Sequence, residues 1–125
     1  MSKTRLWTGR VLSALPVLLL LTSGINLLFI RSQAVRDSFT KLQYPESHYL
    51  TIGILEIACT VLYLIPRTAV LGAILLTAYL GGATASHVRI NDPSFIGAVI
   101  AGILVWAGLY LREERLSALV PLRRS

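Results

Sequence analysis

Charge is scarce in this chain, and the little there is lies between long apolar stretches. Charged residues make up 14% of the 125 residues and hydrophobic residues 54%, with a mean hydropathy of +0.68. Soluble domains carry about 25% charged residues, and their surface helices show polar outer stripes that these stretches lack. The composition therefore excludes an ordinary water-soluble domain and predicts a membrane protein.

Residues with reactive side chains are also few. Cys59 is the single cysteine, so an internal disulfide and a C-x-x-C thiol oxidoreductase are both excluded. The sequence has no Gly-rich phosphate loop and no pair of residues spaced as cofactor ligands, and we predict no metal site. The net charge of +6 comes from lysines and arginines that flank the apolar stretches. Such a placement marks membrane topology and does not indicate nucleic-acid binding.

Four apolar stretches approach or reach the ~17–25 residues that cross a bilayer as a helix. They predict helices at about residues 8–31, 48–65, 68–90 and 93–112. Short links join the last three stretches, so consecutive helices should be antiparallel neighbours. We expect a single domain, residues 1–125, with an all-α fold: an antiparallel bundle of four transmembrane helices. The longer connection between Arg31 and His48 fits either a small amphipathic helix or an irregular polar loop.

The lysines and arginines predict the orientation of this bundle. Eight of them lie on the side that holds both termini and four on the opposite side. Since positive residues are retained in the cytoplasm, we expect both termini to be cytoplasmic.

Glu56 is the most informative residue, because it is a lone carboxyl within an apolar stretch. A charge near the bilayer centre costs ~2.5–3.5 kcal/mol on insertion scales, so such a residue is usually paired, protonated or functional. Helical spacing places it on an inward face of its helix. That face consists of Tyr49, Gly53, Glu56, Cys59, Thr60 and Tyr63.

Other polar side chains should occupy the same half of the membrane. From the helical rise, we expect a polar cavity bounded by Asn26, Glu56, Thr84 and His87, with Arg89 at its mouth. This cavity would bind a small polar headgroup or pass a proton. The alternative is a structural polar network that fixes the helix register. By depth alone, Tyr79 lies closer to Glu56 than His87 does.

Small residues recur at four-residue intervals in the third predicted helix, through Gly81 and Gly82. Apolar helices associate in lipid through such close contacts. We therefore expect one of these glycines to touch a neighbouring helix.

The sequence resembles the DoxX-like family of small bacterial membrane proteins over nearly its whole length. The stretch that begins at Gly53, GILEIACTVLYLIPRTAVLGAILLTAYLGGATASHVRI, carries most of the resemblance, and Tyr44-Pro45 and VWAGLYLREERLSALVP add to it. The resemblance implies a four-helix protein of the bacterial inner membrane. It also implies an association with membrane oxidoreductases, since the family takes its name from members associated with a thiosulfate:quinone oxidoreductase.

Three functions follow from these observations. The first is an accessory subunit, not an enzyme on its own, that binds quinone or lipid for a redox-protein partner or as a homo-oligomer. The second is a small proton-coupled transporter that uses Glu56. The third is an enzyme acting on a lipid or quinone headgroup, with Glu56 and His87 as acid and base.

Overall fold

Every regular element is helical in the computed structural model, which describes residues 2–123. Helix α1 (Lys3–Ile25) continues into one π-helical turn, η1 (Asn26–Ile30), and the short helix α2 (Gln33–Lys41) follows. The remaining elements are α3 (His48–Leu64), the 3₁₀ turn η2 (Pro66–Thr68), α4 (Ala69–Arg89), α5 (Phe95–Arg112) and the 3₁₀ helix η3 (Glu114–Ala118). The predicted all-α class is confirmed. Of the two alternatives for the connection after Arg31, the structure shows the short helix, α2.

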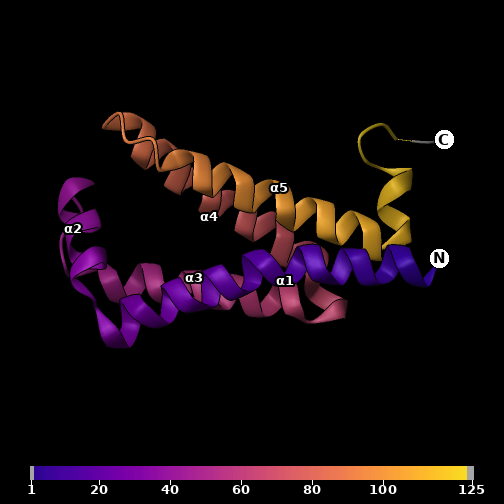
Figure 1. The fold of residues 1–125 in the computed structure, drawn as a ribbon, viewed down its shortest axis with the longest axis horizontal. Helices are drawn as coiled ribbons and strands as arrows, with labels where there is room; N and C mark the ends of the chain where they lie inside the picture. Colours follow the sequence, from indigo (N-terminus) through magenta and orange to yellow (C-terminus); the bar gives the residue numbers. More distant parts are fainter. Residues whose placement is uncertain (1, 124–125) are drawn as a thin grey trace.

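The four long helices pack in a ring, each antiparallel to its two neighbours. Helix α1 lies against α3 and α5, and α4 lies against the same two helices (Figure 1). The pair α1–α3 forms one layer and the pair α4–α5 the other. The layers meet closely at the end that holds both termini and diverge towards α2 at the opposite end (Figure 1). Both termini therefore lie at one end of the bundle, as predicted.

Three segments are long and apolar enough to cross a membrane: Lys3–Ile30, Pro66–Arg89 and Phe95–Arg112. Helix α3 has 17 residues, about 25 Å at helical rise, which is the lower end of the range for a span. Its outer face is aliphatic and exposed, through Leu50, Ile54, Val61 and Leu64. Together these features describe an integral membrane protein, and a crossing by α3 stays a prediction.

The helix boundaries agree with the predicted ones within about two residues, except at the first. Helix α1 begins at Lys3, five residues before the predicted start, with the Ser2 hydroxyl accepting a hydrogen bond from Arg5 N–H. Charged residues end an apolar span, but they do not end a helix. The predicted start at residue 8 marks where the apolar span begins, whereas the helix itself begins at Lys3.

The closest helix contacts lie at the end with the termini, and the prediction for Gly81 and Gly82 is wrong. A Cβ added to either of these glycines would meet nothing within 4 Å. By contrast, a Cβ on Gly9 of α1 would lie 2.8 Å from the carbonyl oxygen of Gly108 in α5. Gly82 lines a pocket beside α2 and α3, and Gly81 lines a groove beside α5, so neither glycine is in close contact with another helix.

Candidate functional site

Glu56 lies in the middle of α3 and is 1% exposed. One carboxyl oxygen, Oε2, accepts a hydrogen bond of 2.5 Å from the Tyr79 hydroxyl of α4 and one of 3.4 Å from the Ser23 hydroxyl of α1. The other oxygen, Oε1, is buried and has no hydrogen-bond partner among the described residues. Glu56 thus joins three helices through one oxygen and keeps the second one unpaired.

The inward face predicted for α3 is confirmed at most of its positions. Tyr49, Gly53, Glu56, Thr60 and Tyr63 are buried, whereas Cys59 is half-buried. The placement of Tyr79 beside Glu56 also follows the depth argument. These two residues lie at nearly equal distances from the turn that joins α3 to α4, so antiparallel packing brings them to the same level.

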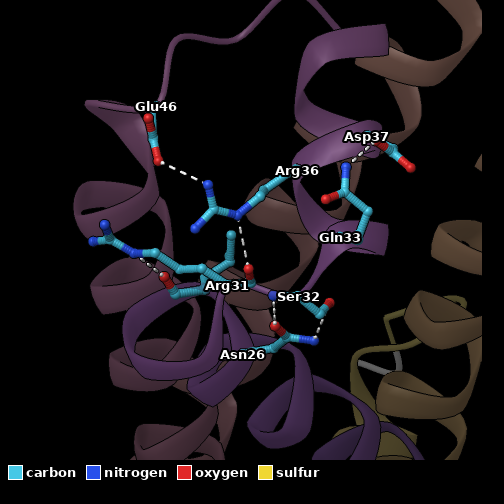
Figure 2. Close-up of polar contacts among 8 residues, drawn as sticks. Asn26, Arg31, Ser32, Gln33, Arg36, Asp37 and Glu46 are labelled. Atoms are coloured by element: carbon cyan, nitrogen blue, oxygen red, sulfur yellow. Dashed lines mark hydrogen bonds and ion pairs between the residues drawn. The ribbon is translucent and has the colours of Figure 1, made fainter.

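Asn26 does not reach Glu56. Its side-chain oxygen accepts a hydrogen bond of 2.9 Å from Ser32 N–H, and its amide donates one of 3.1 Å to the Ser32 hydroxyl (Figure 2). Between them the backbone turns at Arg31, whose φ is 52°. The Asn26 side chain therefore closes the sharp turn from η1 into α2.

The same turn is fixed by two arginines, as Figure 2 shows. Arg31 Nε donates to the Leu27 carbonyl and Arg36 Nε donates to the Arg31 carbonyl. Arg36 also forms an ion pair of 3.6 Å with Glu46. This cluster holds α2 across the end of the bundle, and both polar atoms of the Asn26 side chain are bonded to Ser32 within it.

The other three residues of the predicted cavity have separate partners. The Thr84 hydroxyl donates to the Leu80 carbonyl of its own helix. His87 Nδ1 lies 2.7 Å from the Ala83 carbonyl oxygen, and its Nε2 lies 3.9 Å from Asp92. Arg89 donates to the Leu42 carbonyl, which ties α4 to the connection after α2.

Within residues 2–123, no hydrogen bond or ion pair joins Glu56 to Asn26, Thr84, His87 or Arg89. A ligand-binding role for these four residues stays a prediction. Their sequence spacing gave the depth of each side chain but not the direction in which it points around its helix.

A small pocket lies on the α2 side of Tyr79. Its volume is about 180 Å³, and its walls come from α2, α3, α4 and the connection between α2 and α3. The lining residues are Phe39, Tyr44, Ile52, Tyr79, Gly82, Ala83 and Ser86. We call this the tyrosine pocket. Three of its lining residues carry hydroxyls. Those of Tyr44 and Ser86 are 2.6 Å apart, and that of Tyr79 is bonded to Glu56.

A larger groove, of about 780 Å³, lies on the opposite side of α4, against α5 and η3. Its lining is almost entirely apolar and includes Leu80, Gly81, Gly102 and Leu116. Trp106 Nε1 donates to the Thr77 hydroxyl within this groove, at 2.6 Å. The adjacent glycines of α4 therefore face different spaces, Gly82 the tyrosine pocket and Gly81 the groove.

Sequence reasoning missed the role of Tyr44 and the pairing of Ser86 with it. Tyr44 follows α2 and is 42 residues from Ser86, so only the folded arrangement of α2 brings them together. As for metals, residues 2–123 contain no group of three His, Cys, Asp or Glu side chains placed to hold an ion.

The tyrosine pocket offers a ligand both a donor and an acceptor. One hydroxyl hydrogen of the Tyr44–Ser86 pair stays available after the two groups bond to each other. The Tyr79 oxygen donates its hydrogen to Glu56 and keeps lone pairs that accept. An aromatic wall, Phe39, completes a space for a flat polar ring.

Comparison with known proteins identifies the family. No curated protein and no solved structure matches this chain. A sequence model of the DoxX-like family matches residues 11–109, which include α2, α3, α4, about two thirds of α1 and most of α5. This integral membrane protein therefore belongs to the DoxX-like family.

Proposed function

We propose that this protein is an accessory subunit of a membrane oxidoreductase system and that it binds the ring of a quinone in the tyrosine pocket. The observation that carries the proposal is the pocket itself, with three hydroxyls and one aromatic wall in about 180 Å³. We further propose that it lies in the bacterial inner membrane with both termini in the cytoplasm, as the distribution of lysine and arginine favours.

The size of the pocket suits one six-membered ring. A cavity of ~150 Å³ accommodates benzene in a protein interior, and the tyrosine pocket is slightly larger. A quinone carbonyl would accept the remaining hydrogen of the Tyr44–Ser86 pair, and a quinol hydroxyl would donate to the Tyr79 oxygen. Both the oxidised and the reduced ring would thus form a hydrogen bond in the pocket. This suits a subunit that holds quinone for an oxidoreductase partner.

Glu56 acts here as a positioning residue. Its Oε2 accepts the Tyr79 hydrogen, so the lone pairs of Tyr79 stay free to face a ligand. Glu56 lies behind Tyr79 and is buried in the bundle. Loss of the Glu56 carboxylate would free the Tyr79 hydrogen to turn towards the pocket, so the Tyr79 hydroxyl would no longer be held as an acceptor for the ligand.

Two leucine substitutions at adjacent glycines test the proposal. Gly82→Leu would fill the tyrosine pocket, and Gly81→Leu would extend into the groove between α4 and α5. Neither meets an atom within 4 Å of its Cβ, and both have the same effect on helix propensity. Purified proteins are extracted with solvent, and the quinone that co-purifies is measured by chromatography.

We expect wild type and Gly81→Leu to retain quinone and Gly82→Leu to lose most of it, with similar melting curves for all three. Equal retention by Gly82→Leu would refute the tyrosine pocket as the site. Loss in Gly81→Leu alone would assign the quinone to the groove. An absence of quinone from the wild-type protein, even after short-chain quinone is added, would refute quinone binding altogether.

A second candidate is proton-coupled transport, which the unpaired, buried Oε1 of Glu56 favours. A transporter of this kind should accumulate substrate in vesicles when a pH gradient is applied, and Glu56→Gln should abolish the accumulation. The third function, an enzyme with Glu56 and His87 as acid and base, has no support from geometry, because the partners of His87 are Ala83 and Asp92.

A further inference from the structure

A second polar cavity lies at the opposite end of the bundle from the tyrosine pocket, beside the termini. It has a volume of about 400 Å³, within the roughly 300–1,000 Å³ range of ligand sites. Its polar lining comes from Arg10 and Ser13 of α1, Tyr63 of α3 and Arg112 of α5. We call it the arginine cavity.

The two arginines give this cavity a positive charge. Glu113, the residue after Arg112, interacts with Arg112 electrostatically but does not line the cavity. Among residues 2–123, no carboxylate forms an ion pair with Arg10 or Arg112, and no acidic residue lines the cavity. Within the described part of the chain the partner of Arg10 is aromatic, with its guanidinium 4.9 Å from the centre of the Trp7 ring. An anion is therefore the ligand that the lining favours.

Arg112 is held in place with hydrogen-bond donors to spare. Its Nε donates to the Ser13 hydroxyl at 3.0 Å and one Nη2 hydrogen donates to the Tyr63 carbonyl at 3.3 Å. Its guanidinium also lies 4.7 Å from the centre of the Tyr63 ring. A guanidinium has five N–H groups, so three remain for a ligand in a side chain that is already ordered.

Polarity changes along the cavity in the direction of the membrane. Beyond the arginines the lining is apolar, through Ala14, Val17, Leu18 and Leu64. Leu18 follows Arg10 by eight residues, so the apolar part extends ~12 Å deeper along α1. A ligand that fills the cavity would thus have an anionic head and an apolar tail.

We propose that the arginine cavity binds the phosphate of an anionic phospholipid, with the start of an acyl chain along Leu18 and Leu64. Basic pockets between transmembrane helices at the cytoplasmic side recognise such headgroups. The site is distinct from the tyrosine pocket in its residues and in its end of the bundle, so it does not depend on quinone binding.

Native mass spectrometry of the delipidated full chain in neutral detergent tests the assignment. The protein is titrated separately with phosphatidylglycerol, with phosphatidylcholine of the same acyl chains and with inorganic phosphate. Arg10→Gln is the test variant, because Arg10 donates no hydrogen bond within the described chain. Arg67→Gln is the control, since it makes the same charge change at the same end of the bundle without lining the cavity.

We expect phosphatidylglycerol to bind at least about tenfold more tightly than phosphatidylcholine, and Arg10→Gln to weaken it about tenfold, as expected for one charge-assisted hydrogen bond. Arg67→Gln should leave the affinity within about twofold. Equal affinities for the two lipids, or equal losses in both variants, would overturn the proposal. Inorganic phosphate that binds as tightly and displaces the lipid would assign the cavity to a free anion and likewise overturn it.

Discussion

Replacement of Gly108 by alanine should separate α1 from α5 at their closest approach. A Cβ at this position would lie 2.7 Å from Ser13 N and 3.0 Å from the Gly9 carbonyl oxygen, whereas ordinary contact begins at 3.4 Å. Both of these atoms belong to the backbone of α1, so a change of rotamer cannot relieve the overlap. Helix α1 must move away by several tenths of an ångström.

The expected loss of stability in Gly108→Ala comes from overpacking, and a matched glycine variant serves as its control. Overpacking of a close interface costs about 1–3 kcal/mol. Gly97→Ala lies in the same helix and meets nothing within 4 Å, so it shares the gain of up to ~1 kcal/mol in helix propensity. The difference between the two variants therefore isolates the packing cost at the α1–α5 contact.

Unfolding in mixed detergent and SDS micelles, followed by circular dichroism, measures this difference. We expect Gly108→Ala to be less stable than Gly97→Ala by about 1–3 kcal/mol. If the two variants unfold at the same SDS fraction, α1 and α5 are not in contact at Gly108, and the ring of four helices is incorrect at that end.

Three further predictions concern the ends of the bundle. Arg5 donates to the carbonyls of Tyr110 and Leu111 at the end of α5, so Arg5→Ala should cost about 1 kcal/mol in the same unfolding assay, whereas Lys3→Ala should have no effect. At the opposite end, the Ser94 N–H lowers the pKa of Asp92 below its ordinary value of 3.8, and Lys41 and His87 add to this. The stability that Asp92 contributes is therefore present above pH 3.8 and lost as the pH falls through its lowered pKa. Thermal melts between pH 6 and pH 3 should show a drop in melting temperature that Asp92→Asn lacks. Equal melting profiles for the two proteins would contradict this prediction. Finally, in a Cys59→Ala background, Thr40→Cys should react with an impermeant thiol reagent from the outer face of spheroplasts and Ser2→Cys only after lysis; the reverse pattern would place the termini outside.

The sequence was sufficient for those features that depend on local periodicity. The buried face of α3 and its lipid-facing side follow from spacing alone, because a helix presents residues three and four apart on one side. The level of Tyr79 opposite Glu56 follows from their equal distance from a short turn. Both inferences use only the chain within one hairpin.

Contacts between layers could not be predicted in the same way. A glycine every four residues is compatible with close packing, but it does not say whether a neighbour lies there. Gly81 faces the groove beside α5 and Gly82 faces the tyrosine pocket, while Gly9 and Gly108, outside any obvious ladder, form a tight contact. Likewise, Asn26 has the right depth for Glu56, yet the turn at Arg31 brings Ser32 nearer.

The buried residue Tyr63 has a consequence for the order in which the protein is assembled. Its hydroxyl bonds to Ser13 and to the Val105 carbonyl, and its own carbonyl accepts from Arg112. A ribosome delivers α5 after α1 and α3, so two of these three contacts do not yet exist when the first two long helices have been synthesised. A chain that stops before Val105 would keep the bond from the Tyr63 hydroxyl to Ser13 but would lack the Arg112 donor for the Tyr63 carbonyl, and unsatisfied polar groups near lipid are costly. The arrival of α5 therefore adds the two contacts that fix Tyr63, and with it the packing of α3 against α1.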